Sequence, residues 1–420
     1  MNRTFASLRK HRNYRLFFMG QLVSLSGTWM QTVALAWFVV ELTSSPIAVG
    51  ILAFCRFVPF TIFGLVAGVY ADRFDNRRLV MSTQVSAMAV SVALAVLALS
   101  GGAELWLVYL LAALGGTATV FDAPGRHALT FQMVGRDELP NAVALNATLF
   151  NASRIVGPAI AGVIIATGGT GVCFVVNSVS FLAVLTALVL MRPDELYPLD
   201  RGDSRPTVLR GVRDGLVYAW RTPEVRLILA ITTVLSTLGF NLNVLVPVLA
   251  EETLDAGPEV FGALTASFGA GALAGALLTA TLSRASFKLV LAGSGGFGLA
   301  TLALAPQAEV VVAAMLLFAA GVFFILWNSN SQTILQLTAP DHLRGRVLSL
   351  FLFAFAGLAP LGALVAGWLA HVGGTQLAFA VAGGAGIAMA ALGWAKNPFR
   401  ELPAVAPSAR LEPDFVQRPE

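Results

Sequence analysis

The sequence carries little charge for its length. Of its 420 residues, 57% are hydrophobic and only 12% are Asp, Glu, Lys or Arg, whereas soluble domains carry roughly 25%. A helix that crosses a bilayer needs about 20 mostly apolar residues, and such stretches follow one another along the chain. The stretches also lack the apolar-polar alternation of transmembrane barrel strands. The composition therefore excludes an ordinary soluble domain and predicts an all-α polytopic membrane protein.

Cysteine and catalytic motifs are scarce as well. The two cysteines, Cys55 and Cys173, lie far apart inside apolar runs, so we expect packing residues rather than a disulfide framework or a metal site. The histidines are scattered, and no zinc-protease, serine-hydrolase or Walker sequence is present. The four histidines are His11, His127, His342 and His371. We therefore expect no metal, no cofactor, no enzymatic activity and no ATP hydrolysis.

The apolar runs predict twelve membrane spans, which place both termini on one side. The predicted spans are 14–41, 47–70, 78–100, 105–125, 142–166, 171–191, 226–250, 258–282, 288–305, 310–331, 346–370 and 376–395.

Lys and Arg are absent from every second loop. Of the 27 basic residues, 25 fall on the side of the termini, and the other two, Arg56 and Arg154, fall inside predicted spans. The opposite loops hold acids, including Glu104, Glu251 and Glu309. Because Lys and Arg near membrane ends favour the cytoplasm, we expect a multi-pass cell-membrane protein with both termini cytoplasmic. The net charge of +4 expresses this asymmetry, so we expect no nucleic-acid partner.

The longest polar stretch between spans divides the chain into two groups of six. We expect a cytoplasmic N-terminus at 1–13, a six-helix half at 14–191, a cytoplasmic linker at 192–225, a second half at 226–395, and a disordered tail at 396–420. In the linker, Leu209, Val212, Leu216 and Trp220 recur at helical spacing, which predicts an amphipathic helix. Gly168-Gly-Thr170 recurs as Gly373-Gly-Thr375, as expected of repeated halves with a substrate path between them.

Gly64-Leu-Val-Ala-Gly68 followed by Asp72-Arg73 and Arg77-Arg78 resembles the loop signature of the major facilitator superfamily. Closer resemblance is to its enterobactin-exporter and macrolide-efflux branch, the transmembrane secretion effectors. The segments that show this closer resemblance are Asn13-Tyr-Arg-Leu-Phe-Phe-Met-Gly-Gln-Leu-Val-Ser, Gly27-Thr-Trp-Met-Gln31, Asp122-Ala-Pro-Gly-Arg126 and Arg221-Thr-Pro-Glu-Val-Arg226. The resemblance covers nearly the whole chain up to Lys396. It implies two six-helix pseudo-symmetric halves, alternating access, a proton gradient and a monomer.

The loop signature implies a conformational gate. Gly64 and Gly68 leave a smooth helix face that another backbone can approach. By resemblance, Asp72, Arg73 and Arg77 form a latch that breaks during transport; alternatively, the arginines only fix topology. Gly157-Pro158 resembles the glycine-proline signature of exporters, and the alternative there is an ordinary kink.

Four ionisable residues in or near the spans are candidates for coupling or substrate contact, because a charge inside a bilayer costs on the order of 2.5 to 3.5 kcal/mol. They are Asp122, Arg126, Arg154 and Arg56. Asp122 is either a proton carrier, since burial favours a protonated carboxylate, or a structural partner of Arg126 or Arg154. Arg154 either faces the cavity and contacts substrate, or forms a buried structural pair with Asp122. The same two alternatives, cavity contact or buried structural contact, apply to Arg56. The fourth span lacks the arginine of many proton-coupled relatives, so the residues support proton antiport only in part.

Polar side chains inside the spans are candidates for the substrate cavity, with interhelical packing as the alternative. They are Gln21, Trp29, Gln31, Asn151, Asn241, Asn243, Asn328 and Gln332. Since the path holds arginines and few acids, we expect it to suit neutral or anionic amphiphiles better than dications.

The pattern as a whole predicts a secondary transporter that exports siderophore-like or drug-like small molecules, in contact with membrane lipid. Two alternatives stay open: a non-transporting receptor or assembly protein of the same fold, and an importer.

Overall fold

The computed structural model describes residues 5–198, 208–282 and 285–396; within them, the side chains of residues 65, 66, 68–73, 208–212, 214, 341 and 342 are not described. The chain forms the following helices. In the first half these are α1 (Ala6–Lys10), α2 (Arg12–Thr43), α3 (Pro46–Arg73), α4 (Asn76–Leu99), α5 (Leu105–Gly168), α6 (Thr170–Val189) and the short η1 (Pro193–Glu195). The rest are α7 (Val208–Arg221), α8 (Pro223–Val234), η2 (Leu235–Gly239), α9 (Leu242–Val248), η3 (Leu249–Thr253), α10 (Pro258–Leu282), α11 (Phe287–Leu304), α12 (Val310–Thr338), α13 (Asp341–Leu352), η4 (Phe353–Gly357) and α14 (Ala359–Ala395).

Ten segments of the described chain are long and apolar enough to cross a membrane. Two of them, Leu105–Gly168 with 64 residues and Leu343–Ala395 with 53, are far longer than the roughly 20 residues that one crossing needs. Each is interrupted by non-helical glycine, the first at Gly135 and the second at Gly373 and Gly374. Each therefore counts as two spans, which confirms the predicted all-α fold with twelve transmembrane helices.

The polar segment predicted between the fourth and fifth spans is helical apart from one residue. Gly135 has φ +69°, a conformation that glycine adopts without steric penalty. A Cβ at this position would also lie 3.2 Å from the Tyr197 ring, whose backbone N–H donates to the Gln132 carbonyl at 2.8 Å. The helices continue past the apolar runs because backbone hydrogen bonds do not require lipid, and the chain reverses only at the glycine.

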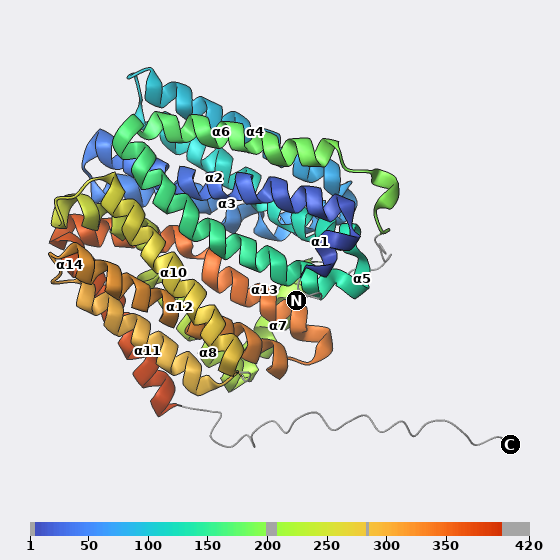
Figure 1. Cartoon of the computed structure of the whole chain (residues 1–420). Coiled ribbons are helices and arrows are strands. Elements are labelled where there is room, and N and C mark those ends of the chain that lie inside the picture. Colours follow the sequence, from blue (N-terminus) through green and yellow to red (C-terminus); the bar gives the residue numbers. More distant parts are fainter. Residues whose placement is uncertain (1–4, 199–207, 283–284, 397–420) are drawn as a thin grey trace.

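The two groups of helices lie side by side, blue to green above and yellow to red below in Figure 1. The C-terminal end of α5 lies beside the N-terminal end of α10 at the left of that view, and the two helices separate toward the right. Helix α7 packs against α8 and α13, and its Tyr218 hydroxyl donates to the Thr338 carbonyl at 3.1 Å. Within the predicted linker and tail, residues 199–207 and 397–420 lie outside the described residues.

Three π-helical turns interrupt two of the spans. The seventh span is α8, η2, α9 and η3 in succession, and the eleventh runs through α13 and η4 into α14. π-turns are frequent at functional sites because they widen the helix and leave part of the backbone ladder irregular. Here η2 and η4 lie next to each other, and η4 also packs against α3 of the other half.

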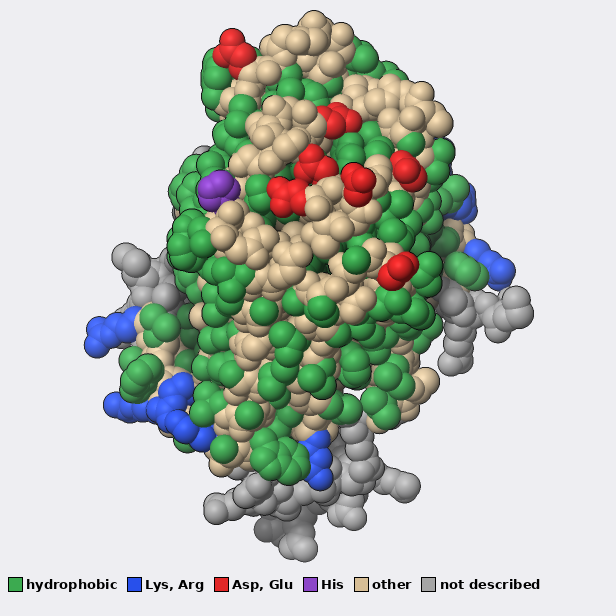
Figure 2. Space-filling model, turned by 90° about the vertical axis from the view of Figure 1, so that its left-hand side faces the viewer, with side chains coloured by type: hydrophobic (Ala, Val, Ile, Leu, Met, Phe, Trp, Pro, Cys, Tyr) green, Lys and Arg blue, Asp and Glu red, His purple; other side chains and the backbone are tan. Residues whose placement is uncertain are grey.

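The two ends of the bundle differ in charge. One, hereafter the acidic end, carries Glu41, Glu104, Glu251, Glu252, Asp255, Glu259 and Glu309 where helices begin or finish. Figure 2 looks onto this end, where acidic side chains gather and Lys and Arg are seen only at the margin. The opposite end, hereafter the basic end, includes α1, α7 and the junction of α3 with α4.

Candidate functional site

The two halves touch most closely near the acidic end. A Cβ at Gly262 of α10 would lie 2.5 Å from the Pro158 carbonyl and 2.9 Å from the Gly162 Cα, both on α5. A Cβ at Gly367 of α14 would lie 2.8 Å from the Pro46 carbonyl and 3.0 Å from the Gly50 Cα. At both places only glycine lets the backbones meet. These two glycine contacts close the interface between the halves at the acidic end.

Further contacts between the halves at this end reinforce the closure. The Ser44 hydroxyl donates to Glu251 Oε1 at 2.9 Å, and the ring of Trp37 stacks on that of Phe261 with centroids 5.9 Å apart. Farther along α3, the Thr61 hydroxyl donates to the Gly357 carbonyl at 2.7 Å. One turn beyond it, a Cβ at Gly64 would have no atom within 4 Å. At Gly64 itself, α3 therefore makes no tight contact with the second half.

Asp122 lies on α5 at the centre of a polar network in the first half. It is 5% exposed. Its Oδ1 accepts hydrogen bonds from the Thr83 hydroxyl and the Gln84 amide of α4, each at 2.9 Å. Its Oδ2 forms an ion pair with Arg126, one turn on along α5, and Arg126 donates to Gln21 Oε1 of α2 at 2.7 Å. The network joins three helices, and the carboxylate pairs with Arg126 and not with Arg154.

Part of this network has no hydrogen-bond partner among the described residues. The atoms concerned are Arg126 Nε, Gln21 Nε2 and Gln84 Oε1, all buried. Buried polar groups without partners are costly, and partly satisfied networks have more than one arrangement of similar free energy. A change in the charge of Asp122 is therefore felt by α2, α4 and α5 together.

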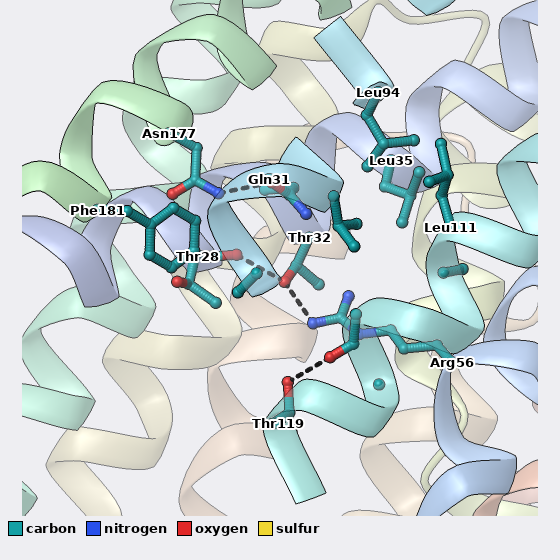
Figure 3. A pocket seen from close by; sticks show the side chains of 15 residues that line it. Thr28, Gln31, Thr32, Leu35, Arg56, Leu94, Leu111, Thr119, Asn177 and Phe181 are labelled. Carbon is teal, nitrogen blue, oxygen red and sulfur yellow. Dashed lines mark hydrogen bonds between the residues drawn. The ribbon is translucent and has the colours of Figure 1, made fainter. Parts of the chain in front are cut away.

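Arg56 lines a pocket inside the first half (Figure 3). Its guanidinium donates to the Thr32 hydroxyl of α2 at 2.8 Å. Gln31, on the same wall, accepts a hydrogen bond from the Asn177 amide of α6 at 2.5 Å. A Cβ at Gly116 of α5 would lie 2.1 Å from the Arg56 carbonyl, so α3 and α5 touch at this level. The pocket is polar on the α2 and α6 side and apolar toward Leu94 and Leu111.

Arg154 projects from α5 against aromatic rings of both halves. Its Cζ lies 5.6 Å from the ring centroid of Trp29, 4.8 Å from that of Phe268 and 5.7 Å from that of Phe324. Trp29 belongs to α2, whereas Phe268 and Phe324 belong to α10 and α12 of the second half. Arg154 therefore lies at the interface of the halves and not against Asp122, and its contact with substrate stays a prediction.

Phe268 and Phe324 belong to a larger aromatic cluster in the second half. Phe240, between η2 and α9, stacks on Phe324 with centroids 4.3 Å apart and also contacts Phe268 and Phe355. Phe240 and Phe355 line a pocket between the halves together with Phe57 of α3. The sequence predictions did not include this cluster, because its phenylalanines resemble the other lipid-facing and core phenylalanines of the chain.

The predicted cavity residues divide among different places. Gln21 lies in the Asp122 network, Gln31 in the Arg56 pocket, and Trp29 beside Arg154. Asn241 and Asn243 line the pocket between the halves, and the Asn328 amide nitrogen is buried without a partner among the described residues. Asn151 donates to the Ala147 carbonyl of its own helix. Gln332 is half-buried on α12. The candidates thus lie at several separate places and do not form one cluster.

The predicted gate residues are described only in part. Asp72, Arg73 and Gly68 lie at the end of α3, but their side-chain surroundings lie outside the described residues. Arg77 donates to the carbonyls of Leu188 and Val189, at 2.8 and 3.2 Å, and so caps the last turn of α6. Asp75, which the predictions passed over, N-caps α4 by accepting from the Arg78 N–H at 2.8 Å. An Asp directly before a helical run is the signal that could have identified it.

The glycine-proline segment of α5 lies where three helices cross. A Cβ at Gly157 would lie 2.7 Å from the Ser26 carbonyl and 2.6 Å from the Trp29 Cβ of α2. Pro158, one residue on, presents its carbonyl to Gly262 of α10. The segment therefore joins the packing of the first half to the closed interface between the halves.

The described residues contain no group of three or more His, Cys, Asp or Glu side chains that could hold a metal ion. Within the same residues, the cysteines Cys55 and Cys173 are free thiols, the second fully buried.

Known proteins with similar sequences are membrane transporters. The family model of transmembrane secretion effectors matches residues 2–418. The chain is 28% identical to the staphyloferrin A transporter of Staphylococcus aureus, over 88% of this chain and 92% of that protein. It is 29% identical to the multidrug efflux pump Tap of Mycolicibacterium fortuitum, over 87% and 90%. It is 21% identical to macrolide efflux protein A of Streptococcus pyogenes, over 90% and 95%.

Solved structures share the fold. The nucleoside transporter NupG superposes with a TM-score of 0.72 at 12% identity, over 95% of this chain and all of that one (100%). A D-xylose-proton symporter superposes with a TM-score of 0.70 at 15% identity, over 91% and 96%. Relatives and fold are those of membrane transporters and not of enzymes, which confirms both the resemblance and the prediction that the chain is no enzyme. The chain belongs to the transmembrane secretion effector family and is a multi-pass membrane efflux transporter of the major facilitator type.

Proposed function

We propose that this transporter exports siderophore-like or drug-like small organic molecules by alternating access, from its basic end to its acidic end. The observation that carries the proposal is the closed interface at the acidic end, formed by the Gly162–Gly262 and Gly50–Gly367 contacts. Arg154 and the rings of Phe268 and Phe324 lie farther from the acidic end than these glycine contacts. A substrate bound there is separated from the acidic end and leaves only when these contacts open.

The basic end faces the cytoplasm in this proposal. Its support is the distribution of charge: 25 of the 27 Lys and Arg fall on the side of the termini, and basic residues near membrane ends are retained in the cytoplasm. Both termini and the segment between the halves, including α7, then lie in the cytoplasm. The division at residues 192–225 and a monomeric state are parts of the same proposal.

We further propose that Asp122 couples export to a proton gradient. Protonation of Asp122 removes the charge that holds Arg126, and Arg126 in turn holds Gln21 of α2. Because the carboxylate also accepts from Thr83 and Gln84 of α4, one proton alters the contacts of three helices. Such a change is the kind of two-state element that a proton can bias.

The test is accumulation of fluorescent dyes, macrolides and catechol siderophores in an efflux-deficient bacterium. Cells with the wild-type protein should accumulate less of at least one compound, and an uncoupler should reverse the difference. Asp122→Asn should abolish export while the protein remains in the membrane at wild-type abundance. Thr148→Ala is the matched control, because the Thr148 hydroxyl is exposed and bonds only within its own helix turn. Export that survives in Asp122→Asn would make Asp122 structural, and uptake driven by the gradient would overturn the direction.

A further inference from the structure

We propose that the Arg154 guanidinium recognises the transported molecule, and that this molecule is an anionic amphiphile. By this we mean an aromatic or aliphatic body that carries a carboxylate or another oxyanion. The inference rests on the export function proposed above and specifies the substrate class of that same interface.

The position of Arg154 is the first step. It is the one described side chain whose cationic group contacts aromatic rings of both halves, at 5.6 Å from Trp29, 4.8 Å from Phe268 and 5.7 Å from Phe324. In alternating access the two halves move relative to each other around the substrate. A group that touches both halves therefore lies where a ligand between them would be contacted.

The hydrogen-bonding state of Arg154 is the second step. A guanidinium has five N–H donors and no acceptor, and rings attract its charge without accepting strong hydrogen bonds. Among the described residues, none forms a hydrogen bond or an ion pair with the Arg154 guanidinium. By contrast, Arg126 has both Asp122 and Gln21, and Arg56 has Thr32. Guanidinium pairs best with a planar oxyanion, which accepts two N–H groups at once.

The surroundings of Arg154 select against a cation. Among the described spans, Asp122 is the acidic residue that lies away from the helix ends. Its carboxylate is already paired with Arg126 and accepts hydrogen bonds from Thr83 and Gln84. The other acids of the described spans lie near helix ends. Arg56 and Arg154 give the interior of the first half a positive potential in a medium of low dielectric constant. That potential attracts an anionic group and repels an amine.

The aromatic cluster accounts for the apolar body of the molecule. Phe268 and Phe324 contact Arg154 on one side and Phe240 on the other, at centroid distances of 5.9 and 4.3 Å. Phe240 and Phe355 continue the wall into the pocket with Phe57 and the amides of Asn241 and Asn243. A ligand with its oxyanion on Arg154 can therefore lay its body along these rings, which offer a large apolar area at little conformational cost.

Binding of three matched probes tests the inference. The probes are 1-naphthylacetate, 2-(1-naphthyl)ethanol and 2-(1-naphthyl)ethylamine, which share a ring system and differ in charge. Binding to the purified full-length protein in nanodiscs is measured by equilibrium dialysis, with empty nanodiscs subtracted. The wild type should bind the acid at least about tenfold more tightly than the amine, because a hydrogen bond to a charged group contributes on the order of 1.5 to 3 kcal/mol.

Variants locate the effect. Arg154→Gln should lose about tenfold or more in affinity for the acid while its affinity for the neutral alcohol stays within about twofold, which also shows that the variant is folded. Arg154→Lys should retain part of the preference, because an ammonium keeps the charge without the planar fork. Arg213→Gln, an exposed change on α7 that removes the same charge, should behave as the wild type. A wild type that prefers the amine or binds none of the probes, or acid binding that survives in Arg154→Gln, would overturn the inference.

Transport of the same probes in proteoliposomes separates this inference from the export function. Acid that binds through Arg154 but is not moved contradicts export and leaves the recognition site in place. Movement of the amine in preference to the acid supports export and rejects the anionic substrate class.

Discussion

The two halves of the chain repeat one helical plan but hold different chemistry inside the membrane. The first half contains the interior charges Arg56, Asp122, Arg126 and Arg154, and its amides bond to them or near them. The second half contributes phenylalanines around Phe324 and, in the middle of its described spans, no charged side chain. The difference teaches that a duplicated fold can place charged and hydrogen-bonding groups in one half and an aromatic surface in the other, with Arg154 in contact with rings of both.

Removal of the Asp122 carboxylate should have the largest effect on this arrangement. Asp122→Ala leaves the half-buried Arg126 without its counter-charge and leaves Thr83 and Gln84 without an acceptor, so we expect a loss of about 3 to 5 kcal/mol in stability. Thermal unfolding of the detergent-solubilised protein measures it. The double variant Asp122→Ala with Arg126→Gln should recover most of the loss, because the unpaired charge is gone. A single variant as stable as the wild type would show that the ion pair contributes nothing to the first half.

Steric change at the glycine contacts tests the closure of the halves at the acidic end. Gly262→Ala places a Cβ 2.5 Å from the Pro158 carbonyl, and overpacking of this kind costs about 1 to 3 kcal/mol. We expect the closed state to be disfavoured and export to fall. Accumulation of an exported compound in whole cells measures the loss of export, and thermal unfolding of the solubilised protein measures the loss of stability.

Gly64→Ala is the matched control for that experiment. A Cβ there would have no atom within 4 Å, and Ala is preferred to Gly in a helix by about 0.5 to 1 kcal/mol. The variant should therefore be as stable as the wild type or slightly more so. Equal losses of stability at Gly64 and Gly262 would contradict the tight contact of the halves at Gly262.

The aromatic cluster of the second half should respond to smaller changes. Phe240→Leu keeps an apolar side chain but removes the ring that stacks on Phe324 at 4.3 Å, and such pairs contribute about 0.5 to 1.5 kcal/mol beyond buried area. We expect a stability loss in that range together with weaker binding of transported compounds. The comparison variant is Phe63→Leu, which removes a looser pair of the first half with centroids 6.1 Å apart. Loss of binding in the second variant but not in the first would reverse the roles of the halves.

Much of the fold follows from the sequence because lipid imposes a length on each apolar run and charge imposes an orientation on each loop. The prediction is less accurate where the chain leaves the lipid. Residues around Gly135 were predicted as a polar connection, yet they are helical on both sides of that glycine. Hydropathy indicates which segments lie in lipid. It does not indicate whether a helix continues beyond the lipid into water.

The site could be predicted only where partners lie on one helix. Asp122 and Arg126 are four residues apart, and that spacing alone indicates their ion pair. Thr83 and Gln84, which bond to the same carboxylate from α4, depend on how two helices rotate against each other, which no local pattern encodes. The two phenylalanine rings on Arg154 were missed for the same reason, since the chain has 28 phenylalanines and only packing distinguishes Phe268 and Phe324 from the others.

The smallest expected effect concerns the amides of the first half. The Asn177 amide donates to Gln31 Oε1 at 2.5 Å across α6 and α2, and an interhelical hydrogen bond in membranes contributes roughly 0.6 kcal/mol on average. A double-mutant cycle with Gln31→Leu and Asn177→Leu should return a coupling free energy of that size in thermal unfolding, with little change in export. If the coupling exceeds about 1.7 kcal/mol, the largest value typical of such bonds, or if either variant abolishes export, the amides do more than hold helices together. The Arg56 pocket would then be part of the transport path, and the first half would contribute substrate contacts beyond Arg154.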